Sequence, residues 1–126
     1  MKNIYSNIFK VNNNNLSKAI NCLKKKELIG VPTETVYGLA GNAYSSKAVK
    51  KIYILKKRPY KNPLIIHYYN LEQLKKDVEL NDNFFKLFKK FSPGPITFVL
   101  RKKRKSLLSN LATAKLGTVA VRFPKN

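Results

Sequence analysis

The chain has 126 residues, 44% of them hydrophobic, which is enough for one globular domain with a buried core over residues 1–126. It carries 26 lysine and arginine residues against 6 acidic residues, for a formal net charge of +20. The single cysteine, Cys22, excludes an intramolecular disulfide, and the single histidine, His67, excludes a multi-histidine metal site. The few scattered acids offer no facing carboxylate pair for glycoside hydrolysis, and no metal site is predicted.

The positive charge has two explanations. A strongly basic chain is typical of proteins that bind nucleic acid or polyphosphate. However, Lys, Asn, Ile, Tyr and Phe are all encoded by A- and T-rich codons, so genome composition alone can raise their numbers together. The run of asparagines at residues 12–15 favours this second explanation. From the composition alone, both remain open.

The sequence shows no segment for membrane insertion or secretion. No apolar run reaches the about 18 residues that a membrane span needs, and the N-terminal segment lacks the apolar block of a secretory signal. A single cysteine also fits a reducing compartment. We therefore predict a cytoplasmic protein that does not contact membranes.

The first part of the chain predicts a helix and then a strand. Apolar residues recur at helical spacing and predict an amphipathic helix over about residues 15–26: Leu16, Ala19, Ile20 and Leu23. Residues 27–32, ELIGVP, predict a short buried strand. The strand runs into GVPTETVYGLAG, residues 30–41, which contains no lysine although lysine is frequent elsewhere.

Residues 45–59 predict a second helix. Ser45 or Ser46 is suited to cap its start, and Pro59 ends it. An apolar stripe runs along it: Val49, Ile52 and Tyr53. Lys56 continues this stripe, so its side chain either extends along the apolar surface to solvent or reaches into a site.

The second half predicts strands on either side of a helix. In residues 63–69, alternation places Leu64, Ile66 and Tyr68 on one face and Ile65, His67 and Tyr69 on the other. Residues 81–91 predict a helix with four inward side chains: Phe84, Leu87, Phe88 and Phe91. Residues 96–103 and 118–123 predict two further strands, and RKKRK, residues 101–105, a basic turn. The alternation of helices and strands predicts the α/β fold class.

Two segments are candidates for binding. In the lysine-free segment, residues 33–35 place Thr-Glu-Thr where a buried strand ends, the usual position for ligands in α/β sheets. The alternative is a polar strand-to-helix turn with capping threonines. In KKRPYKNPL, residues 56–64, Lys56, Arg58 and Asn62 lie in a proline-stiffened corner that can hold phosphates. The alternative there is a solvated basic turn at a helix C-terminus.

Two single residues in predicted strands are also candidates. His67 taken alone is more often structural than functional. Arg122 is flanked by apolar residues in TVAVRFP, so its guanidinium needs an anion or a dipole, and a bound carboxylate is a reasonable partner.

Taken together, four motifs resemble the YrdC-like threonylcarbamoyl-adenylate synthases. They are GVPTETVYGLAGNA, KIYILKKRPYKNPLIIH, FSPGPITFVL and TVAVRFP, in the order and at about the spacing of that family, over residues 16–124. The resemblance implies a twisted, mixed α/β sheet flanked by helices. It also implies a nucleotidyltransferase that joins L-threonine, bicarbonate and ATP into threonylcarbamoyl-adenylate and pyrophosphate.

The resemblance assigns roles to seven positions. Thr35, His67 and Arg122 match the positions that hold L-threonine. Arg58, Asn62 and Thr118 match positions that hold ATP, and Lys56 with Arg58 would carry the catalytic charge. The attacking carbamate is already anionic, so the reaction needs positioning and charge neutralisation rather than a protein base. ATP is then a substrate that brings Mg²⁺, and no tightly bound cofactor is implied.

The resemblance also implies partners and a missing part. The product would pass to a threonylcarbamoyl transferase that modifies transfer RNA. Family members continue after the R-x-P strand into a third containing a P-S-A-N-x-S-G motif, and this sequence ends at Asn126. We therefore expect a site short of one wall, and full catalysis to need more than these residues. A non-catalytic domain that binds double-stranded RNA or transfer RNA is the alternative function.

Overall fold

The computed structural model describes residues 8–34 and 36–125, and these residues form four helices and five strands. The helices are α1 (Asn13–Lys24), α2 (Ser46–Lys56), α3 (Leu71–Lys75) and α4 (Asp82–Phe91). The strands are β1 (Ile29–Pro32), β2 (Tyr37–Ala40), β3 (Ile65–His67), β4 (Phe98–Arg101) and β5 (Thr118–Arg122).

The ends of the helices are set by the side chains that precede them. Asn12, Ser45 and Asn81 cap α1, α2 and α4, each accepting a hydrogen bond from the main-chain N–H three residues later, at 2.8, 3.2 and 2.8 Å. The predicted cap at Ser45 is therefore confirmed. At the other end of α2, Lys57 adopts a left-handed conformation with φ 52°, which turns the chain away from the helix.

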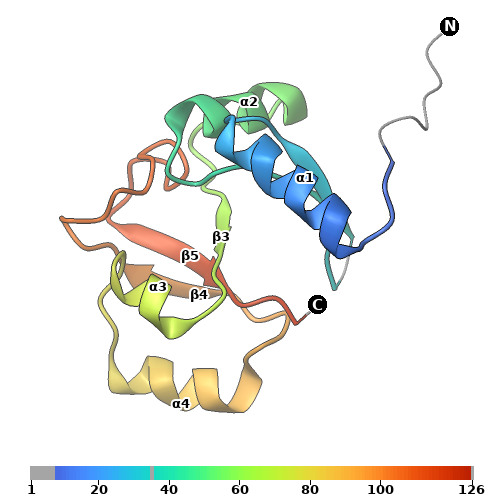
Figure 1. Ribbon diagram of the computed structural model, residues 1–126. Coiled ribbons are helices and arrows are strands. Elements are labelled where there is room, and N and C mark those ends of the chain that lie inside the picture. Colours follow the sequence, from blue (N-terminus) through green and yellow to red (C-terminus); the bar gives the residue numbers. More distant parts are fainter. Residues whose placement is uncertain (1–7, 35, 126) are drawn as a thin grey trace, which may run out of the picture.

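The strands form two sheets, and β5 lies in the middle of the larger one. β1 and β2 pair as an antiparallel hairpin, while the second sheet has the order β3-β5-β4. β5 runs parallel to β3 and antiparallel to β4, so this sheet is mixed as predicted. In Figure 1, α1, α2 and the hairpin are drawn above the three-stranded sheet and α4 below it, and side chains of both α2 and α4 belong to one buried cluster.

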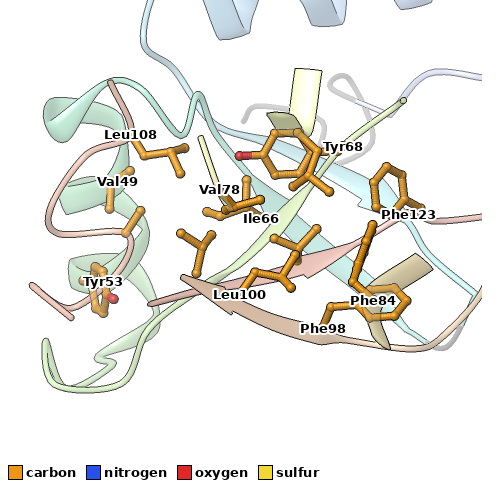
Figure 2. Close-up of a cluster of buried hydrophobic side chains, with 14 residues drawn as sticks. Val49, Tyr53, Ile66, Tyr68, Val78, Phe84, Phe98, Leu100, Leu108 and Phe123 are labelled. Atoms are coloured by element: carbon orange, nitrogen blue, oxygen red, sulfur yellow. The ribbon is translucent and has the colours of Figure 1, made fainter. Parts of the chain in front are cut away.

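The core fills the space between the three-stranded sheet and the helices. One face of the sheet contributes Ile66, Phe98, Leu100, Val119 and Val121, all buried. Figure 2 shows Val49 and Tyr53 of α2 at one end of this cluster and Phe84 of α4 at the other. The Phe84 ring meets Phe98 edge to face, with centroids 5.0 Å apart, a favourable arrangement for aromatic pairs.

Three expectations about the elements were wrong or incomplete. On α4, Leu87 and Phe91 are 44% and 46% exposed, because the inward face turns only Phe84 and Phe88 toward the core. The strand β2 was not predicted, since its segment contains two glycines and alternates weakly. The short helix α3 was also not predicted, because its five residues provide too little periodicity.

The outer face of the larger sheet carries the polar residues of the strands. Ile65, His67, Thr118, Ala120 and Arg122 alternate with the buried positions of β3 and β5. His67 and Arg122 are direct partners in the parallel register, so both side chains leave the sheet on this face. The predicted separation of Ile66 from His67 onto opposite faces is confirmed.

Candidate functional site

A cleft of about 950 Å³ lies between the hairpin, α2 and β3. Its walls include Val31 and Thr33 of the hairpin region, Ile52 and Lys56 of α2, and His67 of β3. Its volume is in the range of small-molecule sites, and its lining mixes apolar side chains with a few polar ones, as such sites do. The cleft therefore brings together two of the four motifs, GVPTETVYGLAGNA and KIYILKKRPYKNPLIIH.

The lysine-free segment forms the hairpin wall of the cleft. In the turn between β1 and β2, the main-chain N–H of Thr33 donates to the carbonyl of Val36 at 3.2 Å, and the N–H of Val36 donates to the Thr33 hydroxyl at 3.1 Å. At Gly41 an added Cβ would lie 2.8 Å from a Leu28 side-chain carbon, so the backbone there packs closely. The turn joins two strands, which corrects the alternative of a strand-to-helix turn. Thr35, assigned to L-threonine, lies outside the described residues.

Arg58 holds the proline-stiffened corner together. Its Nε donates to the carbonyl of Asn62 at 3.0 Å, and its Nη2 donates to the carbonyl of Pro63 at 2.6 Å. The Tyr53 hydroxyl donates to the same Asn62 carbonyl at 2.8 Å. The corner is thus a loop ordered around the guanidinium of Arg58, and Arg58 is also one of the residues that line the cleft. This favours a built cationic corner over a simple solvated turn.

Burial and Arg58 have opposite effects on the pKa of Tyr53. Burial raises the pKa of the Tyr53 hydroxyl above its ordinary value, while the positive charge of Arg58 and its hydrogen bond lower it. The net shift is upward, so this hydroxyl stays protonated and continues to donate to the corner carbonyls at neutral pH. Asn62 contributes to the corner through its main-chain carbonyl, and it is not part of the cleft wall.

Lys56 lies at the end of α2 with an exposed side chain that lines the cleft. Of the two possibilities left by the sequence, this position supports the one in which the side chain reaches a site. The end of α2 therefore presents two cations, Lys56 and Arg58, to the same cleft.

His67 and Arg122 lie side by side at the ends of β3 and β5. Arg122 donates from Nε and Nη2 to the Thr97 hydroxyl at 3.1 and 2.8 Å. The hydroxyl is the dipole that an arginine flanked by apolar residues was expected to need. Partial loss of hydration lowers the pKa of His67, and the charge of Arg122 lowers it further, against an opposing effect of Glu34. The imidazole is therefore held neutral at physiological pH.

Thr118 lies apart from the other predicted site residues. It starts β5 and faces Arg101 of β4, four residues before Arg122 on the same face. At the usual rise along a strand, this places it about 13 Å from Arg122. Neither residue is part of the cleft wall, so the structure brings together Lys56, Arg58 and His67, places Arg122 beside His67, and leaves Thr118 and Asn62 outside.

One polar cluster at the cleft was not predicted. Asp77 is 1% exposed, and its carboxylate accepts hydrogen bonds from the hydroxyls of Tyr44, Tyr68 and Ser106, at 2.5, 2.7 and 2.7 Å. Burial first, and then the hydrogen bond to Asp77 and its negative charge, raise the pKa of Tyr44 to about 12. Burial and the Asp77 carboxylate also raise the pKa of Tyr68. Nothing in the local sequence marks these residues, because their contacts join distant segments.

Two features of general interest concern metals and membranes. In residues 8–34 and 36–125, no group of three or more His, Cys, Asp or Glu side chains is placed to hold a metal ion. Over the same residues, no helix has the length and apolar character that crossing a bilayer requires.

Comparison with known proteins identifies relatives over most of the chain. The threonylcarbamoyl-AMP synthase of Pyrococcus abyssi is 45% identical over 103 residues, which cover 81% of this chain and 30% of that protein. The threonylcarbamoyl-AMP synthase of Bacillus subtilis is 43% identical over 114 residues, which cover 90% of this chain and 33% of that protein. The chain thus spans about a third of the length of these relatives.

The structure agrees with the sequence comparison. The crystal structure of P. abyssi Sua5 complexed with L-threonine matches with a TM-score of 0.86 and 39% identity, covering 94% of this chain and 34% of that one. The YciO structure from E. coli has the same fold, with a TM-score of 0.80 at 20% identity. The model of the Sua5/YciO/YrdC family, described as telomere recombination, matches residues 21–126. This chain therefore belongs to the Sua5/YciO/YrdC family.

Proposed function

We propose that this chain carries the substrate cleft of a threonylcarbamoyl-AMP synthase, which converts L-threonine, bicarbonate and ATP into threonylcarbamoyl-AMP and pyrophosphate. The observation that carries the proposal is the meeting of Lys56, Arg58 and His67 around one cleft. The names of the relatives and the L-threonine in the P. abyssi structure support it.

The chemistry fits the charges of the cleft. The amine of L-threonine takes up carbon dioxide to form a carbamate, and a carbamate oxygen attacks the α-phosphate of ATP while pyrophosphate leaves. The attacking oxygen is already anionic, so no strong protein base is needed. Lys56 and Arg58 would bind the phosphates and offset their charge, and the Mg²⁺ that accompanies ATP adds to this. His67 is kept neutral beside Arg122, so the pair can bind an amino acid without adding a second full cation.

Arg122 would bind the threonine carboxylate. Its Nε and Nη2 already donate to Thr97, and a guanidinium has five N–H donors, so donors remain for a carboxylate. Thr35 would orient the other end of the amino acid, and Asn62 and Thr118 would contact ATP. These assignments, together with delivery of the product to a threonylcarbamoyl transferase, are part of the proposal.

The test is release of pyrophosphate from ATP by the purified protein. We expect release to require both L-threonine and bicarbonate. Replacing Lys56 by Met should lower the rate at least tenfold, since a charge contacting phosphate contributes more than 1 kcal/mol. Lys50→Met is the matched control, because Lys50 is an exposed lysine of the same helix and does not line the cleft. Pyrophosphate release that is independent of L-threonine would contradict the proposal.

A second function, binding of double-stranded RNA or transfer RNA, is favoured by one observation. Lys102, Lys103, Arg104 and Lys115 gather around a separate shallow hollow of about 630 Å³. Affinity for RNA at this surface should fall steeply as salt concentration rises and should not respond to ATP. A flat dependence on salt in a filter-binding or anisotropy assay would count against it.

A further inference from the structure

One wall of the cleft has no role in the proposed function. It is formed by Gln73 and Lys76 at the end of α3 and by Lys105 and Leu107 of the loop that follows β4. We call these four residues the lysine wall. The loop contains the basic run predicted to be a solvated turn, yet one of its lysines lines the cleft.

The loop is held against the segment after α3 by several hydrogen bonds. The main-chain N–H of Lys103 donates to the carbonyl of Asp77 at 2.8 Å, and the Ser106 hydroxyl donates to the Asp77 carboxylate at 2.7 Å. The ammonium group of Lys103 donates to the carbonyl of Lys75 at 2.5 Å. Lys105 lies between these two anchored residues, so its backbone position is fixed on both sides.

The nearby carboxylate is not available to neutralise the lysines. The Asp77 oxygens accept from three hydroxyl groups, and the side chain is almost fully buried. Figure 2 shows the Tyr68 hydroxyl on the side of its ring toward Leu108, in the segment that follows the loop. Over the described residues, the one ion pair joins Lys75 and Glu72, so Lys76 and Lys105 have no carboxylate partner there.

The wall therefore offers hydrogen-bond donors to the cleft. A lysine ammonium has three donors and no acceptor. The Gln73 amide oxygen accepts from the N–H of Tyr69 at 3.3 Å, which leaves its amide N–H groups to donate. Two uncompensated cations and an amide donor in a concave site are suited to an anion with several oxygens.

We propose that the lysine wall is a second phosphate-binding subsite of the cleft, separate from the corner of Lys56 and Arg58 and positioned by Asp77. Phosphate is the ligand because the proposed function brings ATP and pyrophosphate to this cleft, so the inference rests on that function for the identity of its ligand. A concave cleft of about 950 Å³ suits a small polyphosphate better than an RNA duplex.

The experiment measures binding of inorganic pyrophosphate to the whole chain by titration calorimetry at fixed ionic strength, without L-threonine or bicarbonate. Lys105→Met and Lys76→Met should each weaken binding by about tenfold, because each removes a charge-assisted contact. Lys86→Met is the matched control, because it removes one charge from an exposed lysine of α4 that lines neither this cleft nor the basic hollow, and it should change affinity less than twofold. Ser106→Ala should give an intermediate loss, since it only loosens the loop.

The outcomes separate this inference from the proposed function. Equal losses for Lys105→Met and Lys86→Met would overturn the subsite and indicate general electrostatic attraction. A loss of RNA affinity in Lys105→Met with unchanged pyrophosphate affinity would also overturn it. Selective loss of pyrophosphate binding would support the subsite even if no threonine-dependent release were found, in which case only the proposed function would fail.

Discussion

Two polar assemblies border the cleft, and they are built differently. The corner at Arg58 is closed by donors and acceptors four or five residues apart, all within one loop. In the cluster, Asp77 accepts hydrogen bonds from three side chains that lie 9, 29 and 33 positions away from it, each in a different segment of the chain. The corner can therefore form as soon as its loop forms, whereas the cluster requires the tertiary fold.

The difference also concerns charge. In the corner, a cation is bound by neutral carbonyl oxygens and remains partly open to the cleft. In the cluster, an anion is enclosed by neutral hydroxyls and closed to solvent. In a chain with 26 basic and 6 acidic residues, the cleft thus keeps its cations open and buries its acid.

The largest expected effect on stability comes from removing the acid. Asp77→Ala leaves the Tyr68 hydroxyl without its acceptor in a buried place and releases the loop after β4, so the free energy of unfolding should fall by about 3 kcal/mol. Urea denaturation followed by circular dichroism measures this. Glu79→Ala is the control, because Glu79 is an exposed acid two residues away, and it should change stability by less than about 0.5 kcal/mol.

If Asp77→Ala and Glu79→Ala were equally stable, the cluster would not link the segments as described. Asp77→Asn sharpens the result, because the amide keeps one oxygen acceptor. Its stability should lie between those of Asp77→Ala and the unchanged chain.

Removing the cation of the corner should lower the free energy of unfolding by less than removing Asp77 does. Arg58→Met takes away two charge-assisted hydrogen bonds to carbonyls, but those carbonyls lie near solvent and can bind water, so we expect a loss of about 2 kcal/mol. Arg58→Met should also abolish threonine-dependent pyrophosphate release. Arg104→Met, which changes an exposed arginine of the basic loop, should leave both stability and release almost unchanged.

The sequence predicted what depends on short spacing. The cap at Ser45, the buried stripe of α2, the alternation of β3 and the mixed sheet are confirmed, because each follows from local periodicity or from motifs kept in order. The corner was identified for the same reason. The inward face of α4 was wrong at Leu87 and Phe91, since a helix with five apolar residues in ten presents a wider stripe than the sheet can cover.

What the sequence could not provide is pairing between distant segments. Tyr44, Asp77 and Ser106 are ordinary residues in their own neighbourhoods, and their contact depends on how α3 and the loop after β4 meet. The position of Lys105 in the cleft depends on the same meeting. The resemblance to a known family placed Arg122 and His67 in one site, and the register of β3 and β5 then set them side by side.

Within the cluster, the hydroxyl groups of Tyr68 and Tyr44 should contribute differently to stability. Tyr68 is buried, so Tyr68→Phe removes a hydrogen bond from a site that water does not reach and should lower stability by about 1 kcal/mol. Tyr44 is 49% exposed, and Tyr44→Phe should have a smaller effect, since water can take the place of its hydroxyl. Equal losses in urea denaturation would show that burial does not set the strength of these hydrogen bonds.

The smallest effect appears only at high pH. The pKa of Tyr44 is raised to about 12 in the folded chain, against an ordinary value of 10.0, so the folded state holds this proton more tightly than the unfolded state does. The stability that this gives is fully present below pH 10 and is lost as pH rises toward 12. The stability of Tyr44→Phe should therefore depend less steeply on pH between 10 and 12 than that of the unchanged chain, as measured by thermal melts at a series of pH values.

Tyr37→Phe serves as the control, because Tyr37 is 83% exposed and lies outside the cluster, and its alkaline profile should match that of the unchanged chain. Identical profiles for Tyr44→Phe and Tyr37→Phe would mean that burial and the Asp77 carboxylate do not raise the pKa of Tyr44 in the folded chain.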